Sequence, residues 1–139
     1  MHLPAAILNW WATARRPKSL GFRGERAAEK FLKRKGYKIV ARGLRLRGGE
    51  LDLVAVDGRV VVFVEVKTRR NIRFGSPAEA VDARKQSRMT RAASVFIKRH
   101  SLENYSARFD VVAITWPEGA CQPQIEHIPN AFEATGNYQ

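Results

Sequence analysis

The chain is poor in cysteine and histidine and has no long apolar run. Its one cysteine, Cys121, excludes an intrachain disulfide and suits a reducing compartment, so we expect a cytoplasmic protein. Its three histidines, His2, His100 and His127, lack the spacing of zinc ligands. The apolar stretch near the N-terminus is shorter than the roughly 20 residues that a membrane-spanning helix needs, and we expect no membrane partner.

Acidic residues are also scarce, with 13 Asp and Glu against 25 Lys and Arg and a formal net charge of +12. Residues 1–48 hold thirteen basic and two acidic residues, whereas residues 117–139 hold three acidic residues and no Lys or Arg. A basic half of this kind indicates a polyanionic partner, with nucleic acid favoured over an anionic membrane surface. The alternative interpretation is a generally basic soluble protein.

The length of 139 residues suits one domain with one core. We assign residues 1–20 to an N-terminal extension and residues 21–135 to the domain. Helical periodicity predicts a helix over residues 21–35 that ends at a C-capping Gly36. In that helix Glu25 borders the apolar stripe, whereas Glu29 is predicted to lie further round toward solvent.

The remaining elements follow from alternation and turn signals. The sequence S-P-A-E at residues 76–79 has the form of a capping box and predicts a helix that reaches about Arg99. High apolar density in the central strands implies a sheet that is covered on both faces. The order α-β-β-β-α-β-β predicts an α/β fold with helices flanking a central mixed sheet. The strands are expected at residues 37–47, 50–56, 59–67, 108–116 and 123–128.

Charged side chains interrupt the most apolar stretch, GELDLVAVDGRVVVFVEVKTR. A hairpin centred on Asp57-Gly58 would set Asp52 opposite Phe63. Because side chains alternate along strands, Asp52, Glu65 and Lys67 would then share one face. Asp52 and Glu65 would be diagonal neighbours, roughly 7–8 Å apart at the backbone, which allows both carboxylates to reach one cation.

Carboxylates on a largely buried face are unfavourable unless another group compensates their charge. A divalent ion would do so, and oxygen ligands without Cys or His suit Mg²⁺ or Mn²⁺. The competing interpretation is a set of cross-strand salt bridges at a fraying strand end, which Glu65 or Lys67 alone would favour. The combination of Asp52, Glu65 and Lys67 on one face favours the ion. Glu50 is either a further ligand or an exposed residue at the strand end.

The sequence G-E-L-D-L-V followed by V-F-V-E-V-K-T-R resembles the metal-binding core of the PD-(D/E)xK, or restriction-endonuclease-like, nucleases. More closely, the chain resembles the YraN family of small, largely uncharacterised bacterial proteins, which are related in fold to archaeal Holliday junction resolvases. Leu51 precedes Asp52, so the Pro-Asp dipeptide of the superfamily name is missing, as it is from the YraN pattern. The resemblance spans Gly24 to Phe132 and includes GE at 24–25, GELDL at 49–53, VFVEVKTR at 62–69, FGSP at 74–77, KQ at 85–86, RFDVV at 108–112 and NAF at 130–132.

This resemblance implies a restriction-endonuclease-like fold and a metal-dependent nuclease that hydrolyses phosphodiester bonds in DNA, including branched or repair intermediates. It implies Mg²⁺ or Mn²⁺ as the cofactor, held by Asp52 and Glu65 with the carbonyl of Val66 assisting. Lys67 would be the catalytic lysine, and Glu25 would complete the site.

Basic and polar residues around this site are expected to hold the phosphate backbone without reading bases. Asp110 is expected to pair with Arg108 and is excluded as a metal ligand. Two other functions remain open: a non-catalytic nucleic-acid-binding protein with a nuclease-like fold, and an interaction protein whose basic face binds an acidic partner. A two-stranded substrate would suit a homodimer. The expected phosphate contacts are Arg23, Arg45, Arg47, Arg69, Arg70, Arg73, Lys85 and Gln86.

Overall fold

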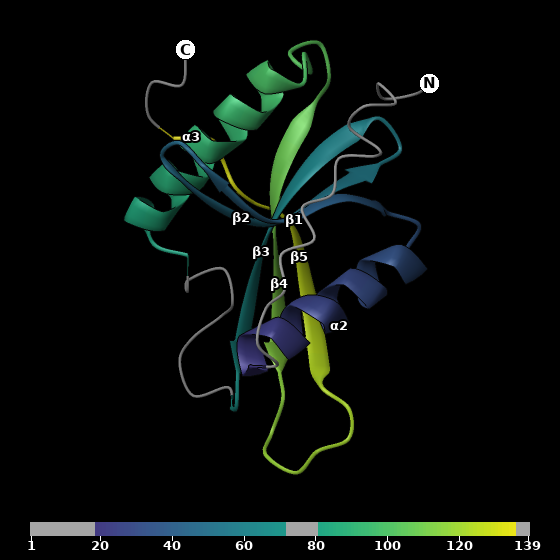
Figure 1. Cartoon of the computed structure of the whole chain (residues 1–139). Coiled ribbons are helices and arrows are strands. Elements are labelled where there is room, and N and C mark those ends of the chain that lie inside the picture. The colour runs from purple at the N-terminus through teal and green to yellow at the C-terminus, as the bar shows by residue number, and fades with distance from the viewer. Residues whose placement is uncertain (1–18, 72–80, 136–139) are drawn as a thin grey trace.

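A computed structural model describes residues 19–71 and 81–135 of the chain. Five strands form one sheet in the order β1-β2-β3-β4-β5, and two helices accompany it (Figure 1). Neighbouring strands are antiparallel except β3 and β4, which are parallel, so the sheet is mixed as predicted. The elements are α2 (Leu20–Arg34), β1 (Lys38–Leu46), β2 (Gly49–Asp57), β3 (Val60–Arg69), α3 (Ala83–Arg99), β4 (Ala107–Thr115) and β5 (Gln124–Phe132).

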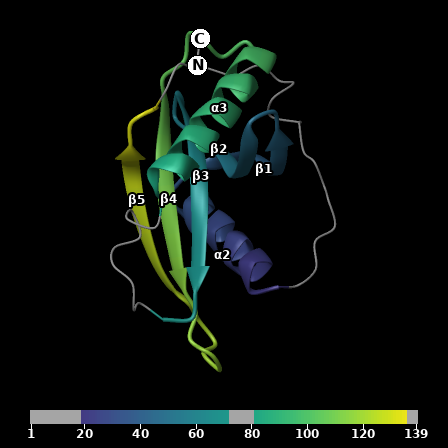
Figure 2. The same ribbon diagram turned by 90° about the vertical axis from the view of Figure 1, so that its left-hand side faces the viewer.

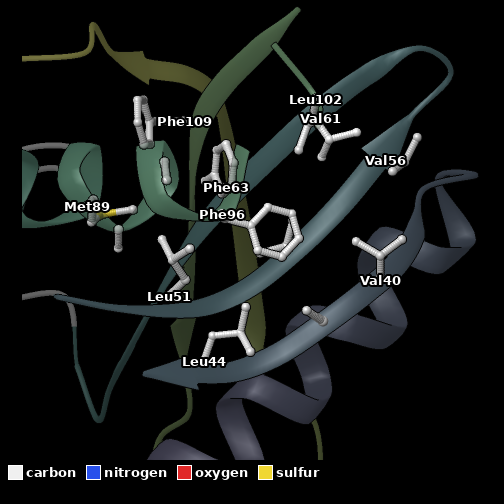
Figure 3. Close-up of a cluster of buried hydrophobic side chains, with 14 of the residues drawn as sticks. Val40, Leu44, Leu51, Val56, Val61, Phe63, Met89, Phe96, Leu102 and Phe109 are labelled. Carbon is white, nitrogen blue, oxygen red and sulfur yellow. The ribbon is translucent and has the colours of Figure 1, made fainter. Parts of the chain in front are cut away.

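The two helices cover opposite faces of the sheet (Figures 1 and 2). On the α3 face, Phe96 meets Phe63 of β3 edge to face with ring centroids 5.8 Å apart (Figure 3). On the α2 face, Ala28 and Leu32 pack on strand residues that alternate with those of the α3 face, such as Val64 beside Phe63. Both faces of β2 and β3 are therefore buried, which explains why these strands are almost continuously apolar.

The structure confirms the end of the first helix and corrects the start of the second. Gly36, just beyond α2, adopts φ +94°, a conformation that disfavours residues with a side chain. Asp82 is extended, with ψ 173°, and caps α3 by accepting a hydrogen bond from the Lys85 N–H at 2.8 Å. A continuous helix from the S-P-A-E segment to Arg99 is therefore wrong; Ser76 and Pro77 themselves lie outside the described residues.

The register of the β2–β3 hairpin also differs from the prediction. Asp57 pairs with Val60 and Leu53 with Val64, so the turn is Gly58-Arg59 and not Asp57-Gly58. The predicted opposition of Asp52 and Phe63 is thus displaced by two residues. Because the side-chain period of a strand is also two, this displacement leaves every side chain on its predicted face.

Glu29 corrects the expected orientation of α2. Its side chain is buried and forms ion pairs with Arg42 of β1 at 3.2 Å and with Lys33 at 3.1 Å. Helical periodicity predicts a position nearer solvent for Glu29, because it carries no information about Arg42 on the neighbouring strand. No helix in the described ranges is long and apolar enough to cross a membrane.

Gly24 sets how closely α2 approaches β3, and its replacement is a test of the fold. A Cβ at residue 24 would lie 1.9 Å from the hydroxyl oxygen of Thr68, and two more Thr68 atoms would be 2.8 Å away. We expect Gly24→Ala to lower the free energy of unfolding by about 1–3 kcal/mol in urea titrations, because the helix must move off the strand.

Gly21→Ala on the same helix is the matched control. The nearest atom to its added Cβ would be a Ser19 oxygen at 3.9 Å, an ordinary contact. We expect this variant to equal or slightly exceed the wild type, since alanine is favoured over glycine in a helix by about 0.5–1 kcal/mol. Equal stability of the two variants would contradict the close approach of α2 to β3.

Candidate functional site

Asp52 of β2 and Glu65 of β3 lie side by side on the sheet, and we call them the carboxyl pair. They lie one residue beyond Leu53 and Val64, the pair farthest from the turn in the β2–β3 hairpin, so both are at the open end of the hairpin. The Val66 N–H donates a hydrogen bond of 2.9 Å to Asp52 Oδ2, which fixes that carboxylate against β3. The prediction that the hairpin brings Asp52 and Glu65 together is therefore confirmed.

The Glu65 side chain is nearly inaccessible, because the residue is only 4% exposed. Burial, together with the charge of Asp52 and a hydrogen bond between the two carboxyl groups, raises the pKa of Glu65 to about 8. Lys85 opposes this shift but does not outweigh it. At neutral pH the carboxyl pair thus holds a proton, and a bound cation would replace that proton.

Lys85, which is expected near the site as a phosphate contact, forms an ion pair with a carboxyl group of the site. Its ammonium nitrogen lies 3.3 Å from Glu65 Oε2, so α3 supplies a cation directly to the carboxyl pair. The Lys85 side chain is 29% exposed and reaches inward from the first turn of the helix. The sequence motif K-Q draws attention to this residue but does not indicate a partner that lies twenty positions earlier.

The other two expected site residues are placed less closely. Lys67 is half-buried on β3 and, two residues beyond Glu65, shares its face by strand alternation. Glu25 is half-buried on α2, beside the Gly24 contact with Thr68. No three His, Cys, Asp or Glu side chains in residues 19–71 and 81–135 gather closely enough to hold a metal. The structure therefore assembles two of the three expected carboxylates, Asp52 and Glu65, and leaves Glu25 outside that pair.

The carboxyl pair nevertheless has the chemistry of half a hard-cation site. Two carboxyl groups meet here, burial and the charge of Asp52 keep a proton on Glu65, and the pair contains no sulfur or imidazole ligand. Mg²⁺ and Mn²⁺ prefer such oxygen donors and usually complete their coordination with water and substrate phosphate. Asp52 and Glu65 fit such an ion as two of its oxygen ligands, and water and phosphate would supply the others.

Most of the expected phosphate contacts lie at the surface. Arg45 pairs with Glu50 at 3.1 Å, with both side chains largely exposed, and Arg47 is also exposed. Arg69 is half-buried at the end of β3, and Arg70 donates to the Trp116 carbonyl at 3.4 Å. The remaining members have these positions: the Arg23 guanidinium stacks 4.2 Å from the Trp116 ring centroid, Gln86 donates to the Val81 carbonyl at 3.0 Å, and Arg73 lies outside the described residues.

A second, separate group of charges, which we call the Asp110 network, is larger than the Arg108–Asp110 pair that the sequence predicts. Asp110 is fully buried in β4 and pairs with Arg108 at 3.0 Å and with His127 Nε2 at 2.8 Å, while the Asn130 N–H donates to it at 2.9 Å. The Lys35 ammonium lies 2.9 Å from His127 Nδ1, so Nε2 carries the proton donated to Asp110. The predicted pairing of Asp110 with Arg108 is confirmed.

This arrangement, a mixed five-stranded sheet between two helices with a carboxyl pair at its central hairpin, is an α/β fold consistent with the restriction-endonuclease-like class. The model of the uncharacterised protein family UPF0102 matches residues 24–114. The chain therefore belongs to this YraN-like family, as its motifs indicate.

Individual relatives support the same assignment. A UPF0102 protein of Geobacter metallireducens is 49% identical over 116 residues, which cover 84% of this chain and 93% of the relative. The UPF0102 protein STH1475 of Symbiobacterium thermophilum is 50% identical over 116 residues, covering 83% and 97% of the two chains. A longer relative, the UPF0102 protein RB9115 of Rhodopirellula baltica, is 48% identical over 120 residues, which are 84% of this chain and 72% of that one.

Proposed function

We propose that the protein is a metal-dependent nuclease that hydrolyses phosphodiester bonds in DNA, with branched or repair intermediates among its substrates. The observation that carries the proposal is the carboxyl pair, because two adjacent carboxyl groups that share a proton supply the oxygen ligands with which a divalent ion could replace that proton. The net charge of +12 supports a polyanionic substrate that is held by phosphate contacts.

Each residue of the site has a proposed role that follows from its position. Asp52, held in place by the Val66 N–H, and Glu65 would bind Mg²⁺ or Mn²⁺, assisted by the carbonyl of Val66. The ion would supply charge stabilisation to the phosphate and an acidified water. Lys67, on the same face of β3, would orient the attacking water or stabilise negative charge on the phosphate as a fixed cation. Glu25 would act from α2 only if substrate or metal draws it toward the pair.

The proposal is tested with purified protein and DNA of different structure. Duplex, flap, single-stranded and four-way-junction DNA are incubated with Mg²⁺, Mn²⁺ or EDTA, and the products are resolved on denaturing gels. We expect cleavage of at least one structure that requires the metal. Absence of cleavage on every structure, in the presence of confirmed metal binding, would overturn the nuclease function.

One observation favours the non-catalytic alternative, a nucleic-acid-binding protein with a nuclease-like fold. Lys85 already provides a cation to Glu65, and the described residues assemble no set of three metal-ligating side chains. In that case the Lys85–Glu65 pair is a permanent structural contact. If the pair binds metal, by contrast, the ammonium of Lys85 competes with the ion for Glu65.

The substitution Lys85→Met separates these two functions. If the carboxyl pair binds metal, removing a competing positive charge 3.3 Å away is expected to tighten Mn²⁺ binding about tenfold in isothermal titration calorimetry. Arg84→Met, an exposed position on the same helical turn, is the control and should leave the affinity unchanged. Loss of thermal stability in Lys85→Met that Mn²⁺ does not restore would favour the structural contact.

A further inference from the structure

A groove of about 750 Å³ lies between the outer side of α2 and the segment that joins β4 to β5. We call it the basic groove and define it by four cationic residues of α2: Arg23, Arg26, Lys30 and Arg34. No acidic side chain is among the described residues that line it. The groove is separate from the carboxyl pair, and Arg23 is the one of its four cations that is also among the expected phosphate contacts.

The cations of the basic groove are not neutralised by carboxylates of the residues that the structure describes. Arg26, Lys30 and Arg34 are exposed, and within the described ranges none forms an ion pair with a carboxylate. Lys33, on another side of the same helix, does pair with Glu29. Among the described residues, one side of α2 therefore presents positive charge without a carboxylate partner, although acidic residues are available elsewhere on the helix, and this favours an anionic ligand.

The geometry of the groove suits a strand with regularly spaced anions. Arg26, Lys30 and Arg34 follow one another at intervals of four residues, so they advance about 6 Å per step along one side of the helix. Neighbouring phosphates of a single nucleic-acid strand have a similar separation. Aromatic rings also line the groove, and Trp116 already stacks against a planar cation, the Arg23 guanidinium, at 4.2 Å.

One end of the groove lies at the same end of β3 as the candidate site, on the other face of the sheet. The backbone N–H of Trp116 donates to the Arg69 carbonyl at 2.8 Å, so this residue lies at the end of β3. Lys67 is two residues before Arg69 on the same strand. A ligand that follows α2 toward Trp116 would therefore reach the end of β3 that follows Glu65 and Lys67, on the face of the sheet opposite their side chains.

We propose that the basic groove binds a single strand of nucleic acid through its phosphates, with aromatic residues at the Trp116 end stacking on bases. Proteins that bind single strands without sequence preference combine a cationic groove with such stacking residues. Only the idea that the bound strand leads to the candidate site rests on the proposed nuclease function. Binding in the groove itself requires neither Asp52 nor a metal.

The first test measures binding in EDTA, where cleavage cannot contribute. A fluorescein-labelled oligothymidine and a duplex of equal length are titrated with wild type and with the triple variant Arg26→Ala, Lys30→Ala, Arg34→Ala, and anisotropy is recorded over a range of salt. We expect tighter binding of the single strand by wild type. The triple variant should bind it at least tenfold more weakly, with a salt slope reduced by about 2, since each phosphate contact of a single strand contributes about 0.7.

A second triple variant controls for the loss of net charge. Like the first, the variant Arg59→Ala, Lys98→Ala, Arg99→Ala removes two arginines and one lysine. These residues occupy exposed positions at the β2–β3 turn and the end of α3, away from the groove. This variant should bind like the wild type, as should Asp52→Asn, and circular dichroism confirms the fold of all variants. Equal weakening by the two triple variants, or equal affinity for duplex and single strand, would overturn the proposal.

Cys121 provides a readout that needs no substitution. It is the only cysteine of the chain, is exposed, and lines the basic groove. We expect saturating oligothymidine to slow its reaction with a thiol reagent several-fold, and to do so in Asp52→Asn as well. An unchanged rate at saturation would place the strand elsewhere, whatever the outcome of the cleavage assays.

Discussion

Asp52→Asn is expected to abolish metal-dependent cleavage, lowering the rate roughly 10³-fold or more. Asparagine keeps the size of the side chain and an oxygen that accepts the Val66 N–H, which donates to Asp52 at 2.9 Å. It removes the negative charge, and a metal ion contributes several kcal/mol to the transition state of phosphoryl transfer, about 1.4 kcal/mol for each tenfold in rate. The measurement is single-turnover cleavage in Mn²⁺, with the rise in melting temperature caused by Mn²⁺ as a second readout.

Two further variants make this result specific. Glu50→Gln removes a carboxylate from the same strand, but the Glu50 side chain is 62% exposed and paired with Arg45, so activity should stay within about twofold of wild type if Glu50 is no ligand. Lys67→Met should lose cleavage while keeping the thermal shift caused by Mn²⁺. Full activity in Asp52→Asn would show that the nuclease is a contaminant or that the site lies elsewhere.

Asp110→Ala is expected to cause the largest loss of stability, on the order of 3–5 kcal/mol in the free energy of unfolding. The carboxylate is fully buried, and its removal leaves Arg108, His127 and the Asn130 N–H without their common acceptor. Removing an exposed pair, as in Arg45→Ala, should change stability by less than about 1 kcal/mol. Urea titrations at neutral pH compare the two variants.

The same carboxylate predicts how stability depends on pH. Burial acts to raise the pKa of Asp110, but hydrogen bonds from His127, Arg108 and the Asn130 N–H outweigh burial and hold the pKa below its ordinary value of 3.8. A lowered pKa in the folded state means that the stabilisation is present above about pH 4 and is lost as the pH falls below it. The acid-induced loss of stability should therefore be smaller in Asp110→Ala than in wild type. An equal acid dependence would contradict this assignment.

The sequence predicted the order of the elements because each depends on a local period or turn residue. Alternation in β2 and β3 placed Asp52 and Glu65 on one face even though the predicted hairpin register was displaced by two residues. A displacement of two preserves facing, whereas a displacement of one would have separated the pair. The capping-box prediction for α3 failed because Asp82 offers a cap nearer to the apolar stripe of that helix.

The sequence singles out Asn130 only as part of the motif NAF and does not predict its contact with Asp110. Asn130 adopts φ +51°, where asparagine is tolerated better than most residues, and this turns its N–H toward Asp110. The pairing of β4 and β5 is irregular at the same point, between Phe109 and Val111. Alternating hydrophobicity predicts the strands but not such a local irregularity, because the reason for it lies on the neighbouring strand.

The sequence by itself determined that an acidic pair and a lysine share one face of a central hairpin within a basic chain, because strand alternation and net charge are properties of the chain alone. Only the tertiary structure decided that Lys85 reaches Glu65, that Glu29 is buried against Arg42, and that the cations of α2 border a groove. Each of these joins residues on different elements, and such contacts depend on how helices pack on the sheet, which no local period specifies.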